Sequence, residues 1–207
     1  WEDATREQIK KVLAKTTRAL NTLYERDAVE ADTRTFVTDI LVDALGYDKY
    51  DELTAEYLVR GEFADIGARV NGELRFFVEI KRITMPLKDQ HLRQVKTNAA
   101  NEGVPWVILT NGKNWQLYHI SSQTPIEHLL VSEIDLMDAK PAQAVEFFLP
   151  ISRGAITRPL LNKMWQDSKG LHPDTVIEAL RSEVVISSVR KQIRSQTGSL
   201  VDSDKLA

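Results

Sequence analysis

Residues 63–82 read FADIGARVNGELRFFVEIKR, and this stretch decides the fold. Asn71-Gly72 is a strong signal for a two-residue β-hairpin turn, because such a turn requires a positive φ that these residues tolerate. We therefore expect antiparallel strands at Phe63–Val70 and Leu74–Arg82. The second strand is mostly apolar from Phe76 to Ile80, which is typical of a central strand covered on both faces.

The periodicity of apolar residues predicts helices and further strands on both sides of this hairpin. The expected architecture is α/β (α+β): a mixed central sheet flanked by helices, with a C-terminal helical appendage. The expected domains are residues 1–150 and an appendage at residues 151–207 whose tail is frayed. The first expected helix is Glu2–Arg26, and the second is capped by Asp32 or Thr33 and ends at Leu45-Gly46. The third is Lys88–Glu102. From Ser132 on the pattern turns helical, and the helices expected there are Pro141–Leu149, Pro159–Asp167 and Pro173–Ser195. The other expected strands are Leu53–Arg60, Trp106–Leu109 and Trp115–Ile120.

The composition is that of an ordinary globular protein. The chain has 207 residues, of which 43% are hydrophobic and 28% charged. It has no cysteine, which excludes disulfides and zinc–thiolate sites and fits a cytoplasmic location. The net charge of −3 argues mildly against strong nonspecific binding to nucleic acid. No apolar run is long enough for a membrane span, and the first residues carry no signal-peptide pattern. A chain that opens with Trp1 is expected to have been processed or cut from a longer one.

Two acids and a lysine stand close together on the predicted hairpin. The two-residue period of a strand places Glu79 and Lys81 on one face. A register centred on the turn places Asp65 opposite Val78, one residue from Glu79, so a small twist or bulge would bring the two carboxylates together. Magnesium prefers hard oxygen ligands. We expect Asp65, Glu79 and the backbone carbonyl of Ile80 to hold it, with Lys81 orienting a water molecule or stabilising negative charge.

A Glu-x-Lys triplet on a strand is more commonly a surface charge pair of little energetic value. The position of Glu79 favours the functional interpretation, because an acid in a buried strand is costly unless it is paired or bound to a metal. The presence of Asp65 on the other arm of the hairpin adds to this argument.

Four stretches resemble the N-terminal nuclease domain of type I restriction enzyme R subunits, within the PD-(D/E)xK nuclease superfamily. They cover about residues 28–120, and their order and spacing make the set more specific than any one of them. The stretches are Glu30–Arg34 before a helix that ends in Leu45-Gly46-Tyr47-Asp48, Ala64-Asp65-Ile66, Val78–Arg82, and Leu109–Gly112 followed by Trp115 and Tyr118.

The resemblance implies a restriction-endonuclease-like fold and a role for each matching residue. Asp65 and Glu79 match the metal-binding acids, and Lys81 matches the catalytic lysine. Glu30 matches an acid that often completes the metal site, although an acid at a helix start also favours the helix dipole. Gln94 matches the glutamine of a Gln-x-x-x-Tyr motif whose tyrosine is absent here, so Gln94 faces either the site or solvent. The implied cofactor is Mg²⁺, with Mn²⁺ as an alternative.

Basic and polar side chains follow the Glu79 strand and could contact DNA phosphates. Each could equally belong to a solvated helix face. The expected DNA-binding residues are Arg82, Lys88, His91, Gln94 and Lys96. The aromatic residues Trp106, Trp115 and Tyr118 could stack on bases, but their strand positions favour core packing.

Three functions are compatible with these patterns. The first is a metal-dependent DNA endonuclease acting on double-stranded DNA, with modification/specificity or motor subunits as further partners. The second is a catalytically inactive nuclease-like fold that binds nucleic acid or a protein. The third is a structural subunit, which predicts a large apolar patch on residues 159–195. The chain has no phosphate-binding Gly-x-x-x-x-Gly-Lys-Ser/Thr loop, so it contains no ATP motor of that type.

Overall fold

The computed structural model describes residues 1–121, 123, 125–202 and 205–206. Contacts divide the chain into two units, Trp1–Trp165 and Gln166–Ala207. The expected boundary after residue 150 lies inside unit 1, because Ile151, Ile156 and Leu161 are buried in the same core as the sheet. As a functional boundary, the division at residue 150 stays a prediction.

Unit 1 is built on one six-stranded sheet whose strands lie side by side in chain order. Neighbouring strands are antiparallel, except that β3 and β4 are parallel. A parallel pair needs a crossover, and α3 (Leu92–Glu102) supplies it. The expected mixed sheet flanked by helices is therefore confirmed. The strands are β1 (Leu53–Val59), β2 (Glu62–Val70), β3 (Glu73–Ile80), β4 (Trp106–Thr110), β5 (Asn114–Ile120) and β6 (His128–Asp135).

The edge strand β6 contradicts the sequence-based expectation that the chain turns helical from Ser132. It pairs antiparallel with β5, so that Ser132 lies opposite Leu117. Most of its residues are half-buried, with no regular alternation of buried and exposed positions. A strand of this kind lacks the two-residue period by which strands are recognised, and its pairing with β5 defines it.

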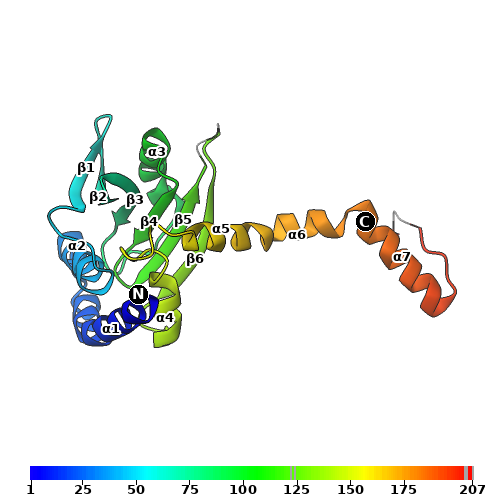
Figure 1. The fold of residues 1–207 in the computed structure, drawn as a ribbon, viewed down its shortest axis with the longest axis horizontal. Helices are drawn as coiled ribbons and strands as arrows, with labels where there is room; N and C mark the ends of the chain where they lie inside the picture. Colours follow the sequence, from blue (N-terminus) through cyan, green and yellow to red (C-terminus); the bar gives the residue numbers. More distant parts are fainter. Residues whose placement is uncertain (122, 124, 203–204, 207) are drawn as a thin grey trace. The chain divides into compact units, whose positions relative to one another are not determined.

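Helices cover both faces of the sheet (Figure 1). One face packs against α1 (Glu2–Glu25), α2 (Glu30–Asp39), the π-helical turn η1 (Ile40–Ala44) and α4 (Pro141–Phe148). The opposite face packs against α3. Alternate residues of β3 point to the two faces: Val78 and Ile80 join the α1 side, and Phe77 joins the α3 side. By the same alternation Glu79 shares the α3 side with Phe77.

The start of α2 also differs from expectation. The sequence predicts a cap at Asp32 or Thr33, but the helix begins at Glu30, after Val29 in an extended conformation. Glu30 and Asp32 therefore lie in the first turn, where negative charge interacts favourably with the helix dipole. The following turn ends at Gly46, whose φ of +82° is the left-handed conformation expected of it.

Unit 2 consists of the end of α5 (Leu160–Gly170), α6 (Pro173–Leu180) and α7 (Glu183–Thr197). The single helix expected at Pro173–Ser195 is interrupted, because Ser182 takes an extended conformation between α6 and α7. Several apolar side chains of α6 and α7 are exposed, among them Leu180 and Val184. In the described part of the chain, no helix is long and apolar enough to cross a membrane.

Candidate active site

The β2–β3 hairpin changes register at a bulge. Near the turn Arg69 pairs with Leu74, but beyond the bulge Ile66 pairs with Val78. One extra residue, Arg75, lies between the two registers. Asn71 (φ +57°) and Gly72 (φ +79°) adopt the positive φ values expected of the turn. The single register expected from the turn is therefore wrong beyond the bulge, because a bulge inserts one residue into one strand only.

The bulge has a direct consequence for the two acids. The pairing of Ile66 with Val78, continued by one residue, places Asp65 level with Glu79 rather than with Val78. Backbone pairing of β2 with β3 ends at Ile66, and beyond it the side chain of Asp65 bonds to β3 instead. Its Oδ2 accepts a hydrogen bond from the backbone N–H of Ile80 at 2.7 Å. Asp65 is thereby held beside β3.

Glu79 and Lys81 form an ion pair on the α3 side of the sheet. Lys81 Nζ donates a hydrogen bond to Glu79 Oε1 at 2.6 Å. The side chains are mostly buried but retain 12% and 18% exposure, and that of Asp65 retains 11%. All three expected catalytic residues are therefore brought to one region that solvent can reach.

Burial and neighbouring charges shift the pKa values of Glu79 and Lys81. Burial raises the pKa of Glu79 to about 7, against the opposing hydrogen bond and charge of Lys81, and the charges of Asp65 and Glu30 raise it further. Burial acts to lower the pKa of Lys81, but its hydrogen bond to Glu79 and the nearby acids outweigh this, so the net shift is upward. At neutral pH Lys81 is therefore a charged ammonium, and Glu79 is about half protonated.

Glu30 lies near the other acids without joining a preformed ligand cluster. Its charge acts on Glu79, Lys81 and His91, which places it within electrostatic range of all three. Among the residues that the structure describes, no group of three or more His, Cys, Asp or Glu side chains is arranged to hold a metal ion. The site instead offers two carboxylates and a strand carbonyl. This donor set fits Mg²⁺, which commonly uses one or two carboxylates and keeps several waters.

The expected DNA-binding residues occupy different environments. Arg82 is engaged by Asp27, whose carboxylate and backbone carbonyl both accept hydrogen bonds from Arg82 Nη2. Lys88 is exposed, and its backbone N–H donates to His91 Nδ1 at 3.2 Å. Burial lowers the pKa of His91, and the charges of Lys81 and Lys88 lower it further. His91 is thus an uncharged neighbour of the site at neutral pH.

Gln94 and Lys96 lie on α3, and their expected contact with DNA stays a prediction. Gln94 Nε2 donates to the backbone carbonyl of Phe63 at 3.0 Å, which ties α3 to the start of β2. Lys96 is half-buried on α3. Trp106, Trp115 and Tyr118 are 5% exposed or less. The core-packing interpretation of these three aromatic residues is confirmed.

Arg34 is the residue at this site to which the sequence analysis assigned no role. Its Nη2 donates to Asp65 Oδ1 at 2.5 Å. The sequence did contain an indication of this position: Arg34 follows Glu30 by one helical turn and therefore lies on the same face of α2. Its link to Asp65, which is distant in the sequence, depends on how α2 packs against the hairpin.

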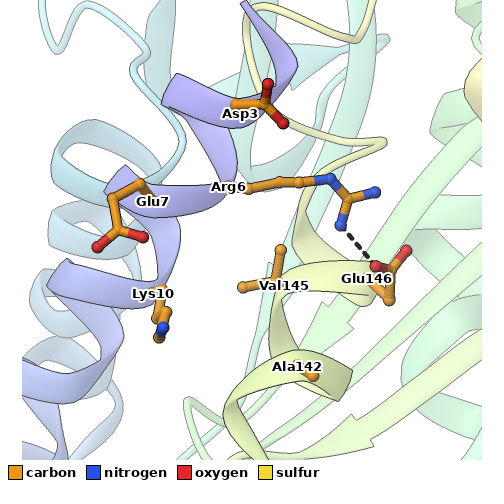
Figure 2. Close-up of a pocket in the computed structure, with 7 residues that line it drawn as sticks. All are labelled: Asp3, Arg6, Glu7, Lys10, Ala142, Val145 and Glu146. Atoms are coloured by element: carbon orange, nitrogen blue, oxygen red, sulfur yellow. Dashed lines mark hydrogen bonds and ion pairs between the residues drawn. The ribbon is translucent and has the colours of Figure 1, made fainter.

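A separate hollow of about 380 Å³ lies between α1 and α4, on the face of the sheet away from α3. Figure 2 shows Arg6 of α1 extending toward Glu146 of α4, with Nη1 and Oε1 2.5 Å apart. Asp3, Glu7 and Lys10 also line it. The lining carries two basic and three acidic side chains, so the two signs nearly cancel, and none of these residues belongs to the Asp65–Glu79 region.

The comparison with protein families identifies the fold's relatives. The model of the family described as type I restriction enzyme R protein N terminus matches residues 29–134, about half of the chain. The chain belongs to this family. The match contains the hairpin, α3 and the four stretches on which the resemblance rested. No curated protein and no solved structure gave a significant match. The expected R-subunit N-terminal domain is thus confirmed, while the roles of individual residues stay predictions.

Proposed function

We propose that this R-subunit N-terminal domain is a DNA endonuclease that hydrolyses phosphodiester bonds with a divalent metal ion. The observation that carries the proposal is the hairpin bulge, which places Asp65 level with Glu79 while Lys81 bonds to Glu79 at 2.6 Å. Family membership supports the same conclusion. The proposed substrate is double-stranded DNA, and the proposed partners are the modification/specificity and motor parts of a restriction enzyme.

Asp65, Glu79 and the carbonyl oxygen of Ile80 would hold Mg²⁺, with Mn²⁺ as an alternative. Such an ion, when bound, lowers the pKa of a coordinated water and neutralises charge on the scissile phosphate. Asp65 is held in place by the N–H of Ile80, so one ligand is positioned before any ion arrives. Glu79, with a pKa of about 7, releases its proton easily near neutral pH and is then a full ligand.

Lys81 would act on the reacting groups directly. Because the pKa of Lys81 is raised, it remains charged at the pH at which Glu79 ionises. An ammonium beside the metal ligands can orient the attacking water or stabilise the negative charge that develops on the phosphate. Glu30 lies within electrostatic range and would reinforce the negative potential that attracts a cation.

The experiment is a Mg²⁺ and Mn²⁺ titration with supercoiled plasmid, comparing the chain with its Lys81→Ala and Lys113→Ala variants. Lys113 is a matched control because it is also ion-paired, with Asp135 at 3.3 Å, and its side chain is 23% exposed. We expect metal-dependent nicking that Lys81→Ala loses and Lys113→Ala retains. Tight DNA binding without cleavage in all three proteins would support a catalytically inactive binding module instead.

A further inference from the structure

Arg34 places a guanidinium at the edge of the proposed nuclease site. Its Nη2 bonds to Asp65 Oδ1 at 2.5 Å, and its side chain is 30% exposed. One nitrogen of the guanidinium is therefore bonded to Asp65, a proposed metal ligand. The side chain as a whole can still be reached from solvent.

The rest of the Arg34 guanidinium is poorly paired. Its Nη1 lies 3.6 Å from Glu56 Oε1, which is too far for a good hydrogen bond, and the Glu56 side chain is 70% exposed. Its Nε is buried and has no hydrogen-bond partner among the described residues. An exposed ion pair of this kind contributes little stability, so Glu56 is easily displaced.

The backbone at Glu56 adds a second observation. Glu56 has a φ of +50° inside β1, between the pairs Ala55–Ile66 and Tyr57–Ala64. It therefore lies at the level of Asp65. A left-handed conformation is unfavourable for a residue other than glycine, because its Cβ comes too close to the following carbonyl oxygen. Such strain is commonly concentrated at functional sites, and here it accompanies a carboxylate placed opposite Arg34.

We propose that Arg34 binds a phosphate of the DNA backbone, and that Glu56 holds its place when DNA is absent. The inference rests on the proposed nuclease function. Nη2 keeps Asp65 in position, and Nη1 exchanges the loose contact with Glu56 for a phosphate oxygen. Arginine suits this task because its planar group bonds several oxygens at once and keeps its charge. The scissile region of the DNA is thereby brought beside Asp65.

The test measures DNA binding rather than cleavage, in an Asp65→Asn background. That background stops the proposed reaction, so the assay measures binding alone, and the amide oxygen can still accept the hydrogen bond from Arg34 Nη2. Fluorescence anisotropy with a labelled duplex is measured over a range of salt concentrations in Mg²⁺. Arg34→Met should weaken binding about tenfold at low salt and reduce the slope of log K against log salt by about 0.9, the value for one phosphate contact.

Arg75→Met is the matched control. Arg75 is 27% exposed, also has a buried Nε without a partner among the described residues, and is paired with Glu73, which is 70% exposed like Glu56. It lies near the hairpin turn, away from Asp65, and its loss changes the net charge equally. We expect Arg75→Met to leave the salt slope unchanged.

Glu56→Gln supplies a second arm that does not depend on the stability of the Arg34 variant. Removing the competing carboxylate should tighten binding about threefold at low salt, since a nearby negative charge repels phosphates, whereas Glu73→Gln should have no comparable effect. If Arg34→Met leaves both affinity and slope unchanged while circular dichroism shows a folded protein, or if Glu56→Gln does not tighten binding, the inference is wrong. The proposed function fails separately, if the wild-type chain neither cuts nor binds DNA with Mg²⁺ present.

Discussion

Replacing Glu79 with Gln should remove the pH dependence of stability that this residue imposes on the metal-free protein. Glu79 has a folded pKa of about 7, against an ordinary value of 4.5, chiefly because it is buried. Between these values the folded protein binds more protons than the unfolded chain, so stability falls as pH rises. The contribution of Glu79 is fully present below pH 4.5 and is lost as pH rises through about 7.

The size of this effect follows from the two pKa values. A difference of about 2.5 units corresponds to about 3.4 kcal/mol, an upper value because the Glu79 side chain keeps some contact with solvent, which screens its interactions. The E79Q variant also changes the hydrogen bond to Lys81, but Lys81 stays charged from pH 4 to pH 8, so that change is a constant offset. The difference in unfolding free energy between E79Q and wild type should therefore shift in favour of E79Q by about 2–3 kcal/mol over that pH range.

Urea denaturation in EDTA, followed by tryptophan fluorescence, measures this difference. All four tryptophans, Trp1, Trp106, Trp115 and Trp165, belong to unit 1, so the signal reports on the unit that contains Glu79. Comparing the two proteins at each pH cancels the other titrating groups. A difference that stays constant from pH 4 to pH 8 would refute the argument that burial dominates at Glu79.

Three further predictions concern the metal and the core. At pH 8, Mg²⁺ should raise the thermal unfolding midpoint of the wild-type chain but not that of E79Q, because a bound ion stabilises only a protein that keeps the side chains that coordinate it. Equal shifts of the midpoint in the two proteins would contradict the assignment of Glu79 as a metal-binding residue. Tyr47→Phe should lower the free energy of unfolding by about 1–2 kcal/mol in urea titrations, since the buried carbonyl of Ile151 loses a hydrogen bond of 2.7 Å. Gly67→Ala should cost about 1–3 kcal/mol, because its Cβ would lie 2.5 Å from the Tyr57 ring. Gly170→Ala, which meets nothing within 4 Å, should be neutral or stabilising, and similar losses in both glycine variants would contradict the packing argument.

The local sequence was sufficient wherever short-range rules decide the structure. Asn71-Gly72 specified the hairpin turn, and the apolar run of β3 indicated a strand buried on both faces. Gly46 has the left-handed φ that the end of its helix requires. By contrast, β6 could not be recognised, because an edge strand of half-buried residues is defined by its pairing with β5 and by little in its own pattern.

The candidate site shows the same division. The residue types and the two-residue period were enough to name Asp65, Glu79 and Lys81 and to place the last two on one face. Only the folded chain brings Asp65 level with Glu79, because the bulge at Arg75 shifts the pairing by one residue relative to a register counted from the turn. Only the folded chain also brings Arg34 to Asp65, since helix packing joins groups that no spacing in the sequence relates.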